Sequence, residues 1–287
     1  MGSLIDIRRR IKSTKNTQQI TKAMKMVSAS RLRRASERAT EARPYADRIH
    51  EVHSSILARL GEVSGSLYSS GEGPKTLLVV VAGDKGLCGS FNTNIFKTVD
   101  LWLRRADNPD DIVILPIGKK SVGRYRKGPQ EVLSGYEGIF RDLTVAFGEE
   151  LSSRLIELFQ EHQFARVMVI YNKFKNVLVQ EVQEEQLLPL SAKIVKDDES
   201  EPGPEHLAEP SLESILEELS PRLVMTRIYQ ALLESNAAEH AARMTAMDAA
   251  TNNAKDLIES LTLEMNKARQ AAITKELIEV VSGAAAL

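Results

Sequence analysis

The sequence predicts a mixed α/β and α+β fold, in which the two ends of the chain form a long antiparallel two-helix coiled coil that carries a central Rossmann-like α/β domain. Two observations support this fold: helix-forming stretches at both ends, and short apolar strands alternating with helices between them. The predicted division is a coiled-coil shaft at residues 1–60 and 209–287, an α/β foot domain at 75–196, and linkers at 61–74 and 197–208.

The last third of the chain predicts one uninterrupted helix. No glycine or proline occurs between Pro221 and Gly283, and the small, straight-chain and charged residues there favour helix. Ser220 suits the N-cap, Pro221 suits the first helical position, and Gly283 follows the last apolar residues as a stop signal. We therefore expect a helix from Ser220 to about residue 282.

This helix carries a seam of apolar and small residues spaced alternately three and four apart, which is the period of a coiled coil. An ordinary long amphipathic helix in a bundle is the alternative, and either structure needs a partner helix. The seam positions are Met244, Met247, Thr251, Ala254, Ile258, Leu261, Met265, Ala268 and Ala272.

Residues 3 to about 60 predict the partner helix. Its first seam positions, spaced three and four apart, are Leu4, Ile7, Ile11, Thr14, Gln18 and Thr21. After a shift of phase, the apolar stripe is expected at Ile20, Met24, Val27, Tyr45, Ile49, Val52 and Ile56. Pro44 should bend or interrupt the helix because it removes a backbone donor. Two long helices at opposite ends of a chain can lie antiparallel, which predicts a two-stranded shaft.

The middle of the chain predicts a layered α/β domain with a largely parallel sheet. Short β-branched runs alternate with helical segments there, which is typical of parallel sheets covered by helices. The expected strands are residues 76–82, 111–117, 165–171 and 176–187, and the expected helices are residues 94–105 and 143–159.

Charge and composition narrow the class of protein. The formal net charge is −1, but residues 1–48 carry 13 Lys or Arg against 4 Asp or Glu, a net of +9, and residues 181–218 carry 2 against 12, a net of −10. No aromatic residue precedes Tyr45 to stack on bases, so we expect no nucleic-acid binding. The single cysteine excludes an internal disulfide, and no apolar run is long enough to span a membrane.

Local motifs give no convincing catalytic site. The loop GDKGLCGSFN at residues 83–92 follows a strand and could cradle a phosphate, but its spacing matches neither a P-loop nor a dinucleotide motif, so a structural turn or a protein contact is preferred. Cys88 has no histidine nearby in sequence and is interpreted as a buried or inert thiol. His50 and His53 share a helix face, but two surface histidines are preferred to a metal site. We predict no cofactor, no metal and no catalytic residue.

Several long motifs resemble those of one family. They are IRRRIKSTKNTQQITKAMKMVSASRLRR at residues 7–34, ARMTAMDAATNNAKDLI at 242–258, RQAAITKELIEVVSGAAAL at 269–287, and the loop at 83–92. They resemble the F-type ATP synthase γ subunit, which implies a central-stalk rotor that transmits torque between a membrane c-ring and a catalytic ring of α and β subunits. The resemblance implies α, β and ε subunits and the c-ring as partners, proton-coupled ATP synthesis, and no catalysis by this chain itself.

The resemblance also implies functional residues. Met24, Lys25, Arg243, Gln270, Thr274 and Glu276 match positions that contact the β subunits, and Leu277, Ile278, Val281 and Leu287 match an apolar bearing tip. Since no transit peptide is visible, we expect a bacterial member, peripheral to the cytoplasmic face of the plasma (inner) membrane. The alternative functions are an α/β nucleotide-binding protein with coiled-coil oligomerisation arms, an α/β enzyme with helical appendages, and a nucleic-acid-binding coil.

Overall fold

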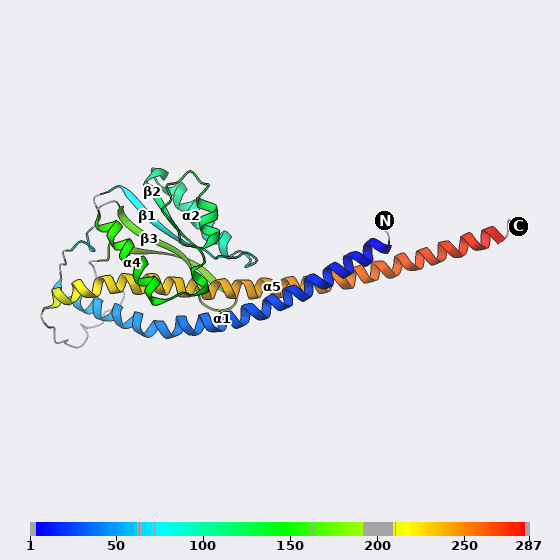
Figure 1. Cartoon of the computed structure of the whole chain (residues 1–287), viewed down its shortest axis with the longest axis horizontal. Helices are drawn as coiled ribbons and strands as arrows, with labels where there is room; N and C mark the ends of the chain where they lie inside the picture. The colour runs from blue at the N-terminus through cyan, green and yellow to red at the C-terminus, as the bar shows by residue number, and fades with distance from the viewer. Residues whose placement is uncertain are drawn as a thin grey trace. The chain divides into compact units, whose positions relative to one another are not determined.

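A computed structural model describes residues 4–61, 63, 65–69, 71, 73–161, 164–191, 209 and 211–284 of the chain (Figure 1). It contains two compact units: unit 1 comprises Met1–Ala29 with Arg243–Leu287, and unit 2 comprises Ser30–Ala242. Helix α1 (Leu4–Leu60) and helix α5 (Leu212–Ala284) each contribute to both units. The predicted linker at 197–208 lies outside the described residues, and the predicted division into shaft, foot and linkers stays a prediction.

Unit 2 is organised around a four-stranded sheet (Figure 1). The strands are β1 (Lys75–Val81), β2 (Ile112–Ile117), β3 (Phe164–Phe174) and β4 (Gln180–Leu188), in the order β2-β1-β3-β4. Strand β1 pairs in parallel with β2 and β3, whereas β4 pairs antiparallel with β3. The predicted strands and the largely parallel sheet are therefore confirmed.

The hairpin between β3 and β4 turns later than predicted. We expected the turn at Asn172 to Lys175, but β3 continues to Phe174 and β4 begins only at Gln180. The reason is the side chain of Asn176, whose Oδ1 accepts from the backbone N–H groups of Leu178 and Val179, at 2.9 Å each. A side chain that mimics a backbone turn in this way places the reversal after Asn176.

Helices cover both faces of the sheet. Alternate residues of a strand point to opposite faces, so Leu78 and Val80 of β1 pack with α2 (Phe91–Arg105). Leu77 and Val79 pack on the other face with α4 (Val145–Gln160) and with α5. The sequence did not predict the short helix α3 (Lys119–Tyr125) or the 3₁₀ turns at Pro109–Asp111 and Ile139–Arg141.

Helix α5 begins earlier than predicted. The structure places its first residue at Leu212, and the Ser211 Oγ accepts from the Ser214 N–H at 3.2 Å, so Ser211 and not Ser220 is the capping residue. Pro221 lies inside the helix. A proline there removes one backbone donor, but burial of Leu216 and Leu223 on either side stabilises the helix across it. The helix also passes the predicted stop at Gly283 and ends at Ala284.

Helix α1 corrects two further predictions. It runs from Leu4 to Leu60, so of the two effects predicted for Pro44, a bend or an interruption, the interruption is wrong. The predicted phase shift is wrong, because Ile20, Val27 and Tyr45 are exposed. The three-four spacing instead continues, and the buried positions of α1 from Thr21 onwards are Thr21, Ser28, Leu32, Ala35, Ala39, Ile49, His53, Ile56 and Leu57. Small side chains at several of these positions are compatible with close backbone approach, which a search for large apolar residues overlooks.

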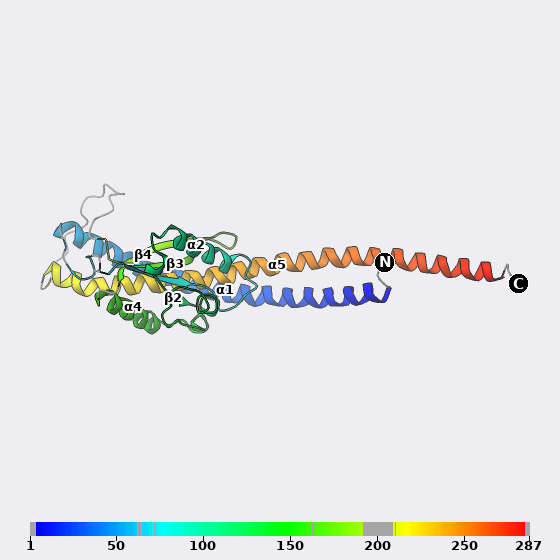
Figure 2. The ribbon, with the colours of Figure 1, turned by 90° about the horizontal axis from the view of Figure 1, so that it is seen from above.

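Unit 1 is a pair of antiparallel helices, formed by residues 4–29 of α1 and 243–284 of α5 (Figure 2). All nine predicted seam positions of α5 are buried or partly buried, with Met247, Ala254 and Leu261 the most enclosed, whereas Leu257 and Leu263 between them are exposed. The C-terminal end of α5 continues past the N-terminal end of α1 (Figure 2). No helix among the described residues carries an apolar stretch long enough to cross a membrane.

Candidate interaction surface of the helix pair

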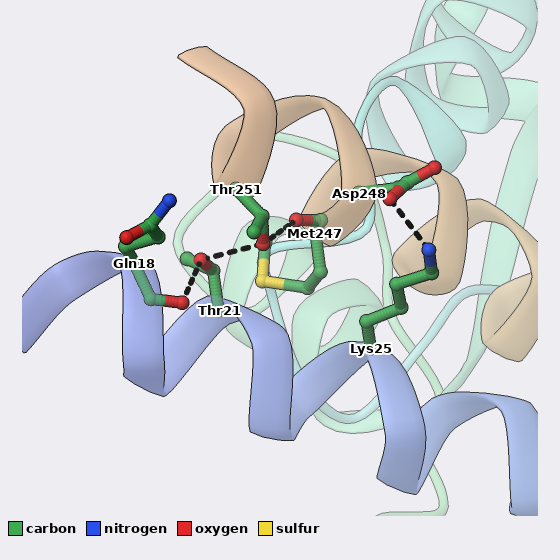
Figure 3. Close-up of polar contacts among 6 residues, drawn as sticks. All are labelled: Gln18, Thr21, Lys25, Met247, Asp248 and Thr251. Carbon is green, nitrogen blue, oxygen red and sulfur yellow. Dashed lines mark hydrogen bonds and ion pairs between the residues drawn. The ribbon is translucent and has the colours of Figure 1, made fainter. Parts of the chain in front are cut away.

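Two polar contacts link the helices of unit 1 in successive turns (Figure 3). The hydroxyl oxygens of Thr21 and Thr251 lie 2.8 Å apart, and the Lys25 Nζ donates to the Asp248 Oδ1 at 2.6 Å. Thr21 is buried at the seam, while the side chains of Lys25 and Asp248 are 42% and 47% exposed. An ion pair this accessible contributes only about 0–1 kcal/mol to stability. The ion pair therefore matters more for how the two helices are positioned than for stability.

The threonine pair also bonds back to its own helices. The Thr251 hydroxyl reaches the Met247 carbonyl at 2.7 Å, and the Thr21 hydroxyl reaches the Gln18 carbonyl at 3.1 Å (Figure 3). Each hydroxyl has one proton, so two of these three hydrogen bonds form at a time. The shorter intrahelical bond belongs to Thr251, which leaves the Thr21 proton to bridge the helices. Neither hydroxyl needs water for a partner.

The predicted contact residues near these polar pairs are less accessible than expected. Met24 lies between Thr21 and Lys25 in the sequence and is partly buried. Lys25 directs its ammonium group to Asp248. Arg243, which has the same predicted role, is buried within the chain.

The predicted contact residues near the C-terminus are exposed. Gln270, Thr274 and Glu276 all face solvent, and the Thr274 hydroxyl donates to the Gln270 carbonyl one turn earlier at 2.9 Å. The predicted bearing residues Leu277, Ile278 and Val281 are 60–66% exposed, whereas Leu287 lies outside the described residues. Large apolar side chains exposed in a row on one helix end are typical of a surface that contacts another protein.

Further apolar residues of unit 1, besides the described bearing residues, are exposed. Ile20, Met26 and Val27 on α1 and Ile273 and Val280 on α5 are all at least 49% exposed. The signal was present in the sequence, because these residues fall between the seam positions of a strict three-four repeat. We had assigned Ile20 and Val27 to the partner-facing stripe instead. They extend the apolar surface of unit 1 to both helices.

The glycine-containing loop of unit 2 is a structural turn. The Gly83 N–H donates to the Asn92 Oδ1 at 2.9 Å, and the Asp84 Oδ1 accepts from the Lys119 and Gly138 N–H groups at 2.9 and 3.0 Å. These hydrogen bonds hold the loop as a structural turn, and one of them uses the Gly83 N–H, a backbone donor that a phosphate cradle would need. Cys88 is buried in this loop, as predicted.

The prediction that His50 and His53 are two surface histidines is wrong for His53. His50 is exposed, but His53 is buried, and its Nε2 lies 2.7 Å from the Tyr68 hydroxyl, which in turn lies 2.7 Å from the Ser220 hydroxyl. Burial, together with the charge of Arg227, lowers the pKa of His53 to about 4. His53 therefore links α1, Tyr68 and α5 as a neutral ring, a role that helical spacing alone did not indicate. Within the described ranges, no three His, Cys, Asp or Glu side chains gather as a metal site.

The fold and these surfaces define a class of protein. A helix pair with a protruding apolar end, together with a helix-covered α/β domain, is typical of a protein that acts through contacts with other proteins. Its exposed surfaces are the candidate site.

Comparison with known proteins identifies the family. The profile of the ATP synthase family matches residues 3–287. The chain is 42% identical to the ATP synthase gamma chain of Heliobacterium modesticaldum over all of both chains, and 42% identical to that of Geotalea uraniireducens over 99% of this chain and 98% of the relative. The chain belongs to the ATP synthase gamma chain family.

Solved structures agree with this assignment. A chain of the Tetrahymena thermophila mitochondrial ATP synthase central stalk and c-ring structure matches with a TM-score of 0.60 and 28% identity, over 80% of this chain and 99% of that chain. A chain of the Euglena gracilis mitochondrial ATP synthase rotor structure matches with a TM-score of 0.67 over 94% of this chain and 98% of that chain. At 18% identity, the second match supports the fold alone.

Proposed function

We propose that this chain is the central-stalk rotor subunit of a proton-transporting ATP synthase, which transmits torque between a membrane c-ring and a catalytic ring of α and β subunits. The observation that carries this proposal is the end-to-end match to ATP synthase gamma chains at 42% identity. The 28% identical match to a central-stalk chain supports it. The chain is a non-catalytic subunit, and its work is done through contacts with the other subunits.

The helix pair of unit 1 has the properties that a rotating part needs. The C-terminal end of α5 exposes Leu277, Ile278 and Val281, and apolar side chains there can slide in an apolar sleeve without fixed hydrogen bonds. We propose these residues, with Leu287, as the bearing tip. Because hydrophobic contact is non-directional, it resists rotation less than a set of hydrogen bonds would.

Mostly polar residues supply the contacts that vary with angle. We propose that Arg243, Gln270, Thr274 and Glu276 contact the β subunits, and that Met24 and Lys25 belong to the segment of α1 that lies near them. Charges on a rotating surface make the Coulomb energy depend on angle, and salt weakens this dependence. A shaft that presents different faces to each β subunit would hold them at different nucleotide affinities, which is a coupling free energy between distant sites.

The remaining assignments follow the same proposal. The partners are the α, β and ε subunits and the c-ring, and no nucleic acid or cofactor is part of the function. As a subunit of an ATP synthase, the chain belongs to the part of the complex that is peripheral to the membrane. We propose the cytoplasmic face of a bacterial inner membrane as its location, which the bacterial origin of the relatives supports.

Reconstitution tests the proposal. The full chain is mixed with α and β subunits, and the complex is isolated by size exclusion and assayed for ATP hydrolysis. We expect a stoichiometric complex with ATPase activity that the chain alone lacks, and ATP-driven proton pumping once ε and the membrane part are added. Recovery of separate components, or ATP hydrolysis by the isolated chain, would overturn the proposal.

A matched pair of variants tests the contact surface. Gln270→Ala with Thr274→Ala changes two exposed contact residues and should leave folding and assembly intact while lowering proton pumping per ATP several-fold. Lys255→Ala alters an equally exposed position of α5 outside the proposed surface and should pump normally. Equal pumping by both variants would remove Gln270 and Thr274 from the contact surface.

A further inference from the structure

We propose that Thr21, Lys25, Asp248 and Thr251 form a register clasp, a set of polar contacts that fixes the axial offset of the two helices in unit 1. In this assignment Lys25 is a positioning residue, whose charge acts on Asp248 within the helix pair rather than on another subunit. The inference deepens the proposed function, and only its coupling measurement rests on that function.

The geometry of the four residues defines one offset. From Thr21 to Lys25 the chain advances four residues along α1, and from Thr251 to Asp248 it goes back three residues along α5, as antiparallel helices require (Figure 3). Two contacts in successive turns fix both the level of the helices and the faces that they present to each other. A single contact would leave the helices free to rotate about it.

The surrounding apolar residues specify this offset poorly. Next to the clasp, the seam of α5 carries Met247, whose flexible side chain adapts to different gaps, and Ala254, whose small side chain fits several registers. On α1 the neighbouring seam positions are the polar residues Thr14 and Gln18. Such a seam allows slippage by one heptad, so a polar device is needed to select the register. Polar residues at core positions of coiled coils commonly have this role.

A slip of one heptad has a defined cost at each position of the clasp. Moving α5 by seven residues places either Ala241 or Lys255 opposite Lys25, which removes the partner carboxylate or brings two positive charges together. The same slip places Met244 or Ile258 opposite Thr21, so its hydroxyl loses the partner on the other helix. The sequence therefore disfavours the two neighbouring registers at both contacts.

The clasp also positions the proposed contact surface. Met24 lies between Thr21 and Lys25 on α1, and Gln270 and Thr274 lie further along α5. These residues belong to different helices, so their relative levels depend on the offset. If the offset changed, the two parts of the contact surface would meet their partners at different heights.

Disulfide trapping measures the register directly in the full chain, with Cys88 replaced by alanine. Counting one and two heptads outward from the threonine pair places Thr14 opposite Ile258 and Ile7 opposite Met265. Cysteine pairs at 14 and 258, or at 7 and 265, report the native register. Pairs at 14 and 265, or at 7 and 258, report slipped registers. With the clasp intact, we expect native pairs to oxidise much faster than slipped pairs.

Charge exchange is the decisive comparison. Lys25→Asp places two carboxylates together and should lower the native-to-slipped ratio roughly three- to tenfold, and Lys25→Asp with Asp248→Lys should restore it. Thr21→Val with Thr251→Val should lower the ratio, while Thr21→Ser with Thr251→Ser should keep it. An unchanged ratio in Lys25→Asp, or no recovery in the exchanged pair, would overturn the clasp.

A coupling measurement then tests whether Lys25 acts inside the shaft. In the reconstituted complex, proton pumping per ATP should fall with Lys25→Asp and recover with the exchanged pair. Recovery of the register without recovery of pumping would show that Lys25 contacts a partner, which overturns its assignment as a positioning residue. If the unaltered chain forms no complex although its register is native, the proposed function fails and the clasp stands.

Discussion

Helix α5 presents two very different surfaces in the two units. In unit 2, apolar residues are buried on most sides of the helix; they include Leu223, Val224, Ile228, Ala231, Leu232, Leu233, Ala237, Ala238 and Ala241. In unit 1, the buried residues that the structure describes on α5 beyond Arg243 are the seam residues Met247, Ala254 and Leu261, and large apolar side chains such as Ile273 and Ile278 face solvent. One continuous helix thus has a core segment and a surface segment.

The difference shows what an apolar pattern measures. Along residues 223–241 the apolar positions are too dense for one stripe, and α5 packs there in the same apolar clusters as both faces of the sheet. Along residues 244–272 the 3.5-residue repeat leaves one narrow stripe, and the helix has one helical partner. The width of the stripe therefore indicates how many neighbours a helix has within its own chain.

Truncating a buried and an exposed isoleucine of α5 tests this difference most directly. Ile228 is fully buried in unit 2, so Ile228→Ala should lower the free energy of unfolding by about 2–4 kcal/mol, through lost burial and the cavity left behind. Ile273 is 49% exposed, and Ile273→Ala should change the free energy of unfolding by less than about 0.5 kcal/mol. Urea unfolding followed by circular dichroism measures both. Equal losses would mean that the two segments do not differ in packing.

Much of the fold followed from the sequence because its signals are local. Periodicity and β-branched runs predicted the long helices, the strands and the larger helices, and the nine positions predicted by the three-four repeat of α5 are all buried or partly buried. The short helix α3 was missed, because its seven residues include Gly123 and show no apolar repeat. The start of α5 was misplaced, because two capping serines, Ser211 and Ser220, compete and the proline after Ser220 favoured the wrong one.

The candidate site was less predictable because it depends on contacts between distant segments. Gln270, Thr274 and Glu276 are exposed, while the contact role that family resemblance implied for them stays a prediction. The pairing of Lys25 with Asp248, 223 residues away, could not be read from either helix alone. Burial of His53 likewise depends on its contact with Tyr68, which lies beyond the end of α1. Local sequence patterns predict which elements form and which of their faces are buried, but not which distant residues they contact.

The buried histidine gives the core of unit 2 a dependence on pH. His53 has a pKa of about 4 in the folded protein against 6.5 for a free side chain, so between these values the unfolded chain binds more protons. Stability of unit 2 should therefore be complete above pH 6.5 and fall by about 2–3 kcal/mol as the pH drops towards 4. Urea unfolding across this range measures the loss.

Two variants separate His53 from other titrating groups. His53→Phe keeps a ring stacked near Tyr68 but cannot be protonated, so its stability profile should be flatter between pH 6.5 and 4 than that of the unaltered chain. Tyr68→Phe removes the hydroxyl that contacts His53 and leaves the ring in place, so the pH dependence should persist. A profile unaffected by His53→Phe would assign the loss to other groups.

Removing the cation from a buried and from an exposed ion pair of α5 should also cost more stability in unit 2 than in unit 1, but the difference should be smaller than for the two isoleucines. The Glu234 carboxylate is 5% exposed, accepts from the Gln230 amide at 3.1 Å, and lies 3.5 Å from the Arg43 guanidinium. Arg43→Ala removes the cation and leaves the carboxylate buried, so it should lower the free energy of unfolding by about 1–2 kcal/mol.

The exposed ion pair in unit 1 is the comparison. Lys255 and Glu259 are 67% and 66% exposed and 4.0 Å apart. Lys255→Ala should cost less than about 0.5 kcal/mol. Because salt screens exposed pairs more than buried ones, raising the ionic strength should remove the second effect and keep most of the first. If Lys255→Ala cost more stability than Arg43→Ala, burial of the Glu234 carboxylate would not make it depend more strongly on its cation.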